Sequence, residues 1–254
     1  MKQSVILWIA TVIIIFLAGY TQRVQSPDYP INGTETLVTG EASFSFDRTA
    51  DSKSNYKVWL ADNCTDLKGI LRWKGTDEKL WHFENMKPDS GTLYAYIPAQ
   101  PPLSRVQYRV ELTDSGKTYL FPVENNVTME FLGHVPSQIS MFYFITLFAG
   151  LLLAVRTGFE VFREPPRLRL YTLFTVISFF CFTLVFSTVK KGCELGIIGG
   201  TKIAPITDIF STGPVLLFAL WILAMIIIFN LKKTRIWAVV AAVGTIVIFL
   251  LGRF

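Results

Sequence analysis

The stretch QISMFYFITLFAGLLLAVRTGFEVF, residues 138–162, decides the architecture of this chain. It is the first hydrophobic run after a long polar segment. A helix needs about 20 mostly apolar residues to cross the hydrocarbon core of a bilayer. The stretch therefore predicts a membrane-spanning helix. It also carries two charged residues, Arg156 and Glu160, which are four positions apart and so share one face of that helix.

Three more apolar runs follow the first one. Together they predict membrane spans at about 138–160, 170–189, 208–230 and 235–252, all rich in Phe, Leu, Ile and Val. Ser, Thr and Gly recur within these runs, and such residues let helices pack closely and form hydrogen bonds in lipid. Residues 134–254 are therefore expected to form an α-helical transmembrane bundle of four spans.

The positions of lysine and arginine predict the orientation of the spans. Loop 163–169 contains three arginines, and loop 231–235 contains two lysines and an arginine. Both loops are expected to be cytoplasmic. The loop 190–207 and the C-terminus would then be extracytoplasmic, although Lys190 and Lys191 are a weak opposing signal. We expect the chain to lie in the cell (inner) membrane.

Residues 1–22 have a charged start followed by an apolar core from Val5 to Gly19. Two interpretations stay open: a cleaved secretory signal peptide, or a signal-anchor helix that is retained. The apolar core is short for a span. Both interpretations place the residues that follow outside the cytoplasm.

Residues 23–40 are polar and predict a linker, whereas residues 41–133 predict about eight short strands separated by turns. Asp114-Ser115-Gly116 is typical of a β-hairpin turn. This density of short strands favours an extracytoplasmic all-β sandwich. The expected strands are 42–46, 56–60, 70–73, 80–83, 92–97, 105–112, 119–123 and 127–131.

The segment GTLYAYIPAQPPLSRVQYRVELTDSGKTYLFP, Gly91–Pro122, resembles a bacterial immunoglobulin-like or fibronectin-type-III-like module. Such modules often place an edge like IPAQP before a strand of the form V-x-Y-x-V and a D-x-G hairpin. The resemblance covers about a third of the β-rich region. It implies an Ig/FnIII-like fold, and it implies almost nothing about function because that fold serves many functions.

The membrane half looks like a family of uncharacterised bacterial membrane proteins with an exported β-domain followed by four transmembrane helices. Residues Arg156–Phe162 match the end of the first span in that family, and Gly200–Asp208 loosely match its outer loop. This chain lacks the aromatic and glycine residues of that loop and has only one of its acids. The resemblance brings no established activity. It implies a shared centre around Arg156, Glu160 and Asp208.

The chain is basic overall, but its charge is unevenly distributed. Residues 21–137 contain 12 Lys/Arg against 15 Asp/Glu, a net charge of −3, while the whole chain has a net charge of +5. The excess of positive charge therefore lies beside the apolar runs, where it reflects membrane topology. We expect membrane lipids and protein partners, and no nucleic acid.

Few residues are suited to a cofactor or to catalysis. The chain has two histidines, His82 and His134, neither of which lies in a predicted span, and it has no Cys-x-x-Cys-His motif. Haem held by two histidines and His/Cys metal sites are therefore not expected. No Ser-His-Asp set can be assembled with any specificity. We expect no cofactor, no metal and no catalytic residue.

Four residues are candidates for an intramembrane or interfacial role. Arg156 and Glu160 predict either a buried functional ion pair or a pair at the membrane end, with Arg156 reaching toward the headgroups. Asp208 predicts either a helix cap or a cation or proton site. His134 predicts a structural residue at the membrane boundary, or one that contacts headgroups, a partner or a quinone.

The three cysteines are Cys64, Cys181 and Cys193. Cys181 lies in the middle of a span and is expected to be packing. Cys64 and Cys193 both fall on the predicted extracytoplasmic side, where disulfides persist. They predict either a disulfide or two separate thiols.

Three hypotheses for function remain open. The first is a non-catalytic accessory or interaction subunit of a membrane complex, with an exported β-sandwich that docks a partner. The second is a small ion- or solute-coupled transporter that acts as an oligomer and uses Arg156, Glu160 and Asp208. The third is a lipid- or quinone-linked membrane enzyme subunit.

Overall fold

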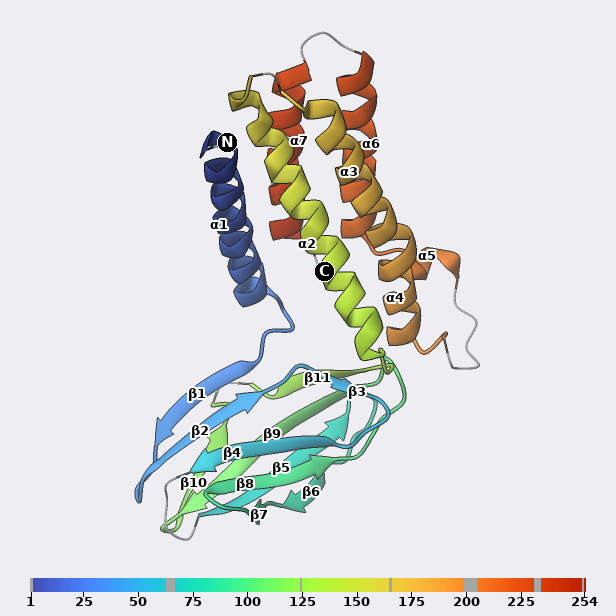
Figure 1. Ribbon diagram of the computed structural model, residues 1–254. Helices are drawn as coiled ribbons and strands as arrows, with labels where there is room; N and C mark the ends of the chain where they lie inside the picture. The colour runs from blue at the N-terminus through green and yellow to red at the C-terminus, as the bar shows by residue number, and fades with distance from the viewer. Residues whose placement is uncertain are drawn as a thin grey trace. The chain divides into compact units, whose positions relative to one another are not determined.

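A computed structural model of the chain describes residues 2–62, 67–123, 125–164, 166–198, 205–230, 234–252 and 254. The chain divides into two compact units (Figure 1). We call them the helical unit, Met1–Ser26, Val135–Cys193 and Ile197–Phe254, and the β unit, Pro27–His134 and Glu194–Gly196.

The described residues of the β unit form two sheets. One has the strand order β1-β2-β4-β8-β7, and the other has the order β3-β11-β9-β5-β6 with β10 paired to β9. Neighbouring strands are antiparallel except β3 and β11, which are parallel. The strands are β1 (Ile31–Thr36), β2 (Glu41–Phe46), β3 (Thr49–Asp51), β4 (Tyr56–Asp62), β5 (Lys68–Gly75), β6 (His82–Asn85), β7 (Lys87–Pro88), β8 (Thr92–Ile97), β9 (Arg105–Asp114), β10 (Lys117–Phe121) and β11 (Val127–Leu132).

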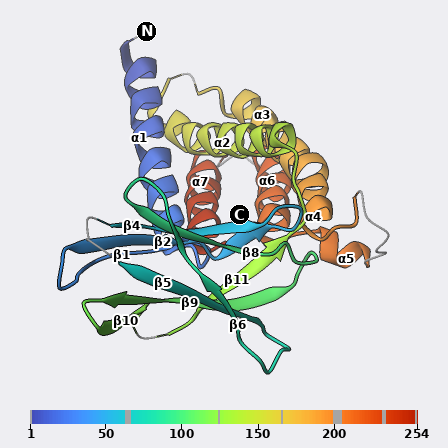
Figure 2. The same ribbon diagram turned by 90° about the horizontal axis from the view of Figure 1, so that it is seen from below.

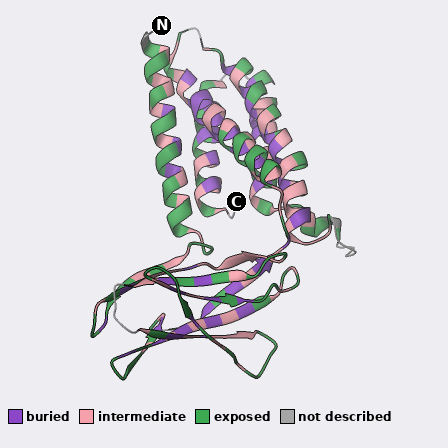
Figure 3. Ribbon diagram, turned by 60° about the horizontal axis from the view of Figure 1, so that its bottom comes forward, coloured by how far each residue is buried: buried purple, intermediate pink, exposed green. Residues whose placement is uncertain are grey.

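The two sheets share one hydrophobic core, which makes the β unit a sandwich. Every second residue of β9 is buried, from Val106 to Asp114, while the residues between them face outward. Leu60 of the first sheet and Leu71 and Val110 of the second are fully buried in the same cluster. The alternation of buried and more exposed residues is visible along the strands in Figure 3. This period of two is what a half-buried sheet requires of its sequence.

The expected strands have counterparts in the structure, which confirms the β-rich prediction, although the strand expected at 80–83 lies at His82–Asn85 as β6. The hairpin predicted at Asp114-Ser115-Gly116 joins β9 to β10. Ser115 and Gly116 have positive φ angles of 49° and 81°, as a tight hairpin turn of this kind needs. The sequence missed β1, β3 and β7. The first lies in the expected linker, and the other two are only 3 and 2 residues long.

Asp114 is a buried carboxylate that fastens the loop before β2 to the end of β9. Its oxygens accept hydrogen bonds from the backbone N–H of Thr39 at 2.8 Å and from the Thr39 hydroxyl at 2.9 Å. Burial raises the pKa of the Asp114 carboxyl, but the hydrogen bonds from Thr39 and Ser115 lower it more. The pKa therefore lies below its ordinary value of 3.8.

The depressed pKa of Asp114 predicts an acid-sensitive β unit. The ionised carboxylate stabilises the fold fully above the unfolded-state pKa, and this contribution is lost as pH falls through the lower folded-state pKa. Asp114→Asn is expected to lower the melting temperature of the β unit at pH 7 and to flatten its decline below about pH 4. Thermal melts of the full chain at a series of pH values measure this, with exposed Asp77→Asn as the control. The prediction is contradicted if the melting temperatures of the wild type and Asp114→Asn decline identically as the pH is lowered.

Within the described residues, the helical unit has five helices that are long and apolar enough to cross a membrane. They are α1 (Lys2–Gln25), α2 (Ser137–Phe159) extended by η1 (Glu160–Phe162), α3 (Leu168–Phe180) continuous with η2 (Cys181–Ser187) and α4 (Thr188–Glu194), α6 (Thr212–Asn230) and α7 (Thr234–Leu251). A short helix, α5 (Ile206–Ile209), precedes α6. Four of the five long helices correspond to the expected spans. The expected span 208–230 is shorter at its start, because α6 begins at Thr212.

The five helices pack into one bundle. Contacts join α2 to α3 and α7, α6 to α3 and α7, and α1 to α2 and α7 (Figure 2). Small residues permit some of these contacts, since a side chain added at Gly158 of α2 would meet Cβ of Ala242 of α7 at 2.6 Å. Hydrogen bonds between helices add to the packing, such as the one that the Trp221 indole N–H donates to the Thr245 hydroxyl at 2.8 Å.

Candidate functional site

Arg156 and Glu160 form a fully buried ion pair at the end of α2. Arg156 lies in the last turn of α2, and Glu160 is the first residue of η1, four positions later. Arg156 Nη2 lies 2.6 Å from Glu160 Oε1, and both side chains have no exposed surface. Opposite charges at this spacing share one helix face, as the sequence predicts. The two charges therefore neutralise each other inside the helical unit.

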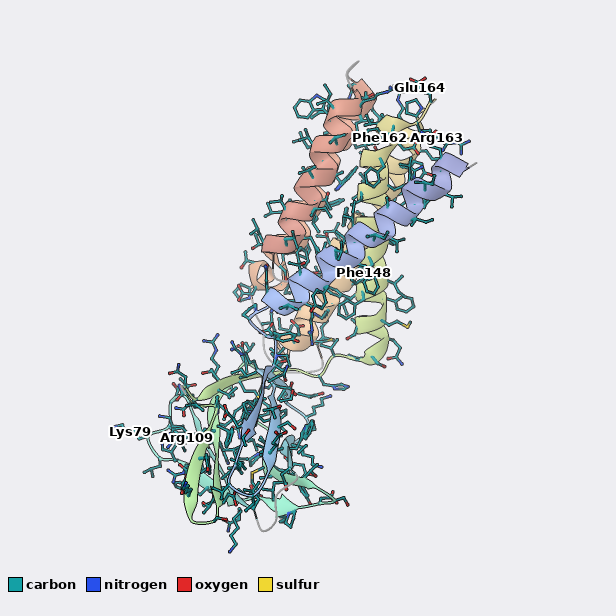
Figure 4. The ribbon with its side chains drawn as sticks, turned by 90° about the vertical axis from the view of Figure 1, so that its left-hand side faces the viewer. Lys79, Arg109, Phe148, Phe162, Arg163 and Glu164 are labelled. Atoms are coloured by element: carbon teal, nitrogen blue, oxygen red, sulfur yellow. The ribbon has the colours of Figure 1, made fainter. Side chains whose placement is uncertain are left out.

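The Glu160 carboxylate also holds the turn between α2 and α3. Its Oε2 accepts a hydrogen bond of 2.8 Å from the backbone N–H of Arg167, the residue that caps the start of α3. Arg163 Nη1 lies 3.7 Å from Oε1 and is partly exposed. A carboxylate at the start of a helix is favoured by the free N–H groups and the dipole there. Glu160 thus fixes where α3 begins. Arg163 and Glu164 are labelled at this turn in Figure 4.

Side chains of α1 and α3 cover the guanidinium of Arg156. Its Cζ lies 5.6 Å from the ring centre of Trp8 and 5.0 Å from that of Tyr171, and the two rings meet edge to face. Nη2 donates a long hydrogen bond of 3.5 Å to the Ser4 hydroxyl. Aromatic faces attract a cation, and the attraction grows when water is excluded. Three helices therefore meet at Arg156.

Some polar atoms of the site have no hydrogen-bond partner among the described residues. These atoms are Nε and Nη1 of Arg156 and Oε1 of Glu160, and the hydroxyl of Thr172 in α3 is likewise buried without such a partner. Glu160 Oε1 is nevertheless in ionic contact with Arg156, because close approach of the charges does not require the alignment that a hydrogen bond needs. The site is neutral, but it is not saturated with hydrogen bonds.

Arg156 does not reach out to the surface. A snorkelling arginine would leave its guanidinium accessible, whereas this side chain is fully buried. The site nevertheless lies near a helix end, since Arg156 is six residues before Phe162, or about 9 Å along the helix axis. The pair thus combines burial with a position close to the end of a predicted span.

Asp208 is not part of this site. It lies on α5, its side chain is exposed, and its Oδ1 accepts a hydrogen bond from the Thr207 hydroxyl at 3.3 Å. Within the helical unit, α5 lies at the end opposite to the turn between α2 and α3 (Figure 1). The centre of Arg156, Glu160 and Asp208 that the resemblance implies is therefore not assembled within the chain. The loop before Pro205 falls at 199–204, outside the described residues.

His134 belongs to the β unit. Its Nδ1 lies 2.5 Å from Oδ2 of Asp51, next to the parallel pairing of β3 and β11. Burial raises the pKa of the Asp51 carboxyl, but the contact with His134 and a hydrogen bond from the Lys53 backbone lower it more, so the pKa lies below 3.8. His134 thus has a structural partner. The predicted disulfide is not tested, because Cys64 lies outside the described residues; Cys193 is buried in α4.

Sequence reasoning missed Ser4, Trp8 and Tyr171, which surround Arg156. A signal existed only for Trp8, the one tryptophan in the mostly aliphatic run from Val5 to Gly19. Nothing local in the sequence links residue 8 to residue 156.

Among the described residues, no group of three or more His, Cys, Asp or Glu side chains is arranged to hold a metal ion. No protein-family model matches the chain, and no curated protein shows significant similarity to it.

Proposed function

We propose that this chain is an integral protein of the cell (inner) membrane with five spans, an extracytoplasmic β unit and a cytoplasmic N-terminus. The basic residues support this orientation. Arg163, Arg167 and Arg169 lie between α2 and the first turn of α3, and Arg235 lies at the start of α7. The N-terminus, this turn and the start of α7 lie at one end of the helical unit (Figure 1). Positive charge concentrated at one end of a bundle favours the cytoplasmic side.

We propose that α1 is a retained signal anchor. Its Thr11, Ile15 and Ala18 are buried against the bundle. Its Trp8 covers Arg156, and its Gln3 amide donates a hydrogen bond of 2.9 Å to the carbonyl of Phe162. Removal of α1 would take the Trp8 ring away from the guanidinium of Arg156 and leave only Tyr171 of the two rings over it, which is unfavourable for a charge paired in a low-dielectric site.

Retention of α1 is tested by intact-mass analysis of the protein purified from its membrane. We expect one species near the full-length mass of 28.7 kDa that contains residues 2–25. The control is a variant that carries a strong cleavage site in place of Gly19-Tyr20-Thr21, which should yield the shorter mass. A native product beginning near residue 22 would show that the first helix is a cleaved signal peptide.

We propose that the β unit is an immunoglobulin-like sandwich. The strand order supports this: β2-β4-β8-β7 corresponds to the order A-B-E-D of that fold, and β5 and β11 flank β9 as C and G flank F. The FnIII-like alternative shares the architecture. Membership of the bacterial membrane family that the sequence resembles is likewise a proposal.

We propose that the protein is a non-catalytic interaction subunit, in which the helical unit anchors an exported β-sandwich that docks a partner. The observation that carries this is the Arg156–Glu160 pair, which is neutralised, covered by aromatic rings and bonded to the start of α3. A charge that must bind and release an ion needs access and mobility, whereas this pair ties three helices together. It therefore supports an anchor with a fixed structure.

The experiment that tests this is gentle detergent extraction at native expression level, followed by native mass measurement and identification of co-purifying chains. A partner in fixed ratio is expected. A lone monomer or homo-oligomer would rule out the subunit role.

The second candidate is an ion- or solute-coupled transporter that acts as an oligomer. The observation in its favour is that Nε and Nη1 of Arg156 and the hydroxyl of Thr172 are buried and have no hydrogen-bond partner within the described part of the chain. In this candidate a passing ion or water completes their hydrogen bonds. Its test is ion flux in proteoliposomes with Thr172→Val, which removes the hydroxyl and keeps the side-chain volume.

A further inference from the structure

The outer face of β5 and β9 carries a concentration of positive charge, although the part of the chain to which it belongs is acidic overall. Alternate residues of both strands point inward to the core, so the residues between them form one outer surface. Their cross-strand register places these outer residues side by side. We call this surface the basic face; its cations are Lys68, Arg72, Lys74, Arg105 and Arg109.

Two arginines stand directly opposite each other at the centre of the basic face. Arg72 and Arg109 are cross-strand partners, an arrangement that is unfavourable for like charges. Glu111 lies between them. It contacts Arg72 closely and lies 3.5 Å from Nη2 of Arg109. Nε of each arginine is buried and has no hydrogen-bond partner among the described residues. The side chains of Arg72 and Arg109 are 31% and 30% exposed, so the two guanidiniums share one carboxylate and remain partly open to a second.

Aromatic residues border the same face. Lys74 Nζ lies 5.1 Å and Arg109 Cζ 5.5 Å from the ring centre of Trp81, so both cations hold this ring. Arg72 Cζ lies 4.9 Å from the ring centre of Phe83, which is 61% exposed, and Leu80, three residues earlier in the chain, is 80% exposed. Figure 4 shows Arg109 on the same side of the β unit as Lys79, and Lys79 lies in the turn before Trp81 and Phe83. Cations and exposed apolar groups thus lie together.

The charge of the basic face opposes that of its surroundings. Residues 21–137 have a net charge of −3. Among the described residues, the carboxylates in ion pairs with these five cations are Glu111 and Glu130, and Glu130 lies 3.7 Å from Arg105. Arginine and tryptophan in such surroundings are the residues that contribute most to protein interfaces. Guanidiniums in pairs also match carboxylates geometrically.

We propose that the basic face is the docking surface for a protein partner that presents an acidic, extended segment with apolar residues between its carboxylates. This rests on the proposed function as an interaction subunit. The carboxylates pair with Arg72 and Arg109, and the apolar side chains contact Phe83 and Leu80. A polypeptide fits better than a sulfated polymer because it carries both groups a few ångströms apart. In addition, β6 is the last strand of its sheet, and an extended segment can pair with such an edge.

The test measures binding of the full chain, in nanodiscs of zwitterionic lipid, to a synthetic peptide of about twelve residues that alternates glutamate and leucine. A peptide with glutamine in place of glutamate is the neutral comparison. We expect binding of the acidic peptide, weakened by added salt because surface charges are screened, and at least tenfold weaker binding of the neutral one. Equal affinity for the two peptides, or tighter binding of heparin or of phosphatidylglycerol vesicles, would overturn the proposal.

Variants locate the binding on the molecule. The double variant Lys74→Glu with Arg105→Glu is expected to weaken binding of the acidic peptide at least tenfold. Both side chains lie on the outer surface, so their replacement does not disturb the core. Lys57→Glu with Lys87→Glu makes the same change of charge on the other sheet and is expected to change affinity less than twofold. Equal losses in the two double variants would place the effect in overall charge and refute the basic face.

Phe83→Ser separates the apolar contact from the charge. This variant should weaken binding of the glutamate–leucine peptide and leave binding of poly-L-glutamate unchanged. Equal effects on the two ligands would refute the apolar part of the proposal. Co-purification of the native partner distinguishes a failure of the basic-face proposal from a failure of the proposed function as an interaction subunit. A native partner retained by Lys74→Glu with Arg105→Glu overturns the basic face and leaves the subunit role intact. The absence of any partner in the wild type overturns both.

Discussion

Replacing Arg156 with alanine is expected to destabilise the helical unit by about 3–5 kcal/mol, the usual penalty for removing one member of a buried ion pair. The remaining Glu160 carboxylate would keep its backbone hydrogen bond from Arg167 and its longer contact of 3.7 Å with the partly exposed Arg163, but it would lose the only fully buried cation paired with it among the described residues. Trp8 and Tyr171 would also lose the cation that they cover. Unfolding of the purified protein, followed by tryptophan fluorescence during an SDS titration, measures the loss. Arg169→Ala, on an exposed position of α3, is the control.

A double variant shows whether the charges or the shapes matter. Arg156→Met combined with Glu160→Met removes both charges and retains apolar volume, so it should recover most of the stability lost in Arg156→Ala. Recovery together with normal assembly would identify the pair as structural. If Arg156→Ala folds as stably as the wild type and instead abolishes an ion flux, the anchor interpretation is wrong and the transporter candidate is favoured.

Replacing Gly158 with leucine is expected to separate α2 from α7 and to cost about 2–3 kcal/mol, as overpacking of a tight contact does. Even a single carbon added at Gly158 would lie 2.6 Å from Cβ of Ala242, which is closer than two carbon atoms pack. The same close contact is what small residues provide in helix pairs. The loss is measured in the same SDS titration, and by the fraction of protein that elutes as a single species in size-exclusion chromatography.

A compensating change makes this prediction specific. Gly158→Ala alone should be destabilising, and Gly158→Ala with Ala242→Gly should restore stability, because the methyl group has only been moved across the contact. Gly244, whose added side chain would meet Leu220 at 3.2 Å, offers a milder comparison through Gly244→Ala. If Gly158→Leu is as stable as the wild type, the two helices are not in the contact described.

The two predictions differ in what they report. Arg156→Ala removes a charge that three helices share, while Gly158→Leu changes only the distance between two of them. If both variants lose the native partner together with stability, the partner depends on the assembled anchor. If only variants of the basic face lose it, the partner depends on the β unit.

The sequence by itself determined the eight strands that were expected and the four apolar runs after residue 137. These follow from local rules, since a half-buried strand alternates and a spanning helix needs a continuous apolar run. The i, i+4 spacing placed Arg156 and Glu160 on one helix face for the same reason. The sequence did not reveal β1, because INGTET carries few apolar residues and is a strand only through its pairing with β2.

The tertiary structure alone decided which residues meet. Trp8 and Arg156 are 148 positions apart, and only the packing of α1 against α2 brings the ring over the guanidinium. Arg72 and Arg109 face each other only because β5 and β9 pair in one register, since a shift by one residue would bury one of the two arginines. Periodicity fixes the face that a residue occupies within its own element. The neighbour across that face depends on register and packing between segments far apart in the chain.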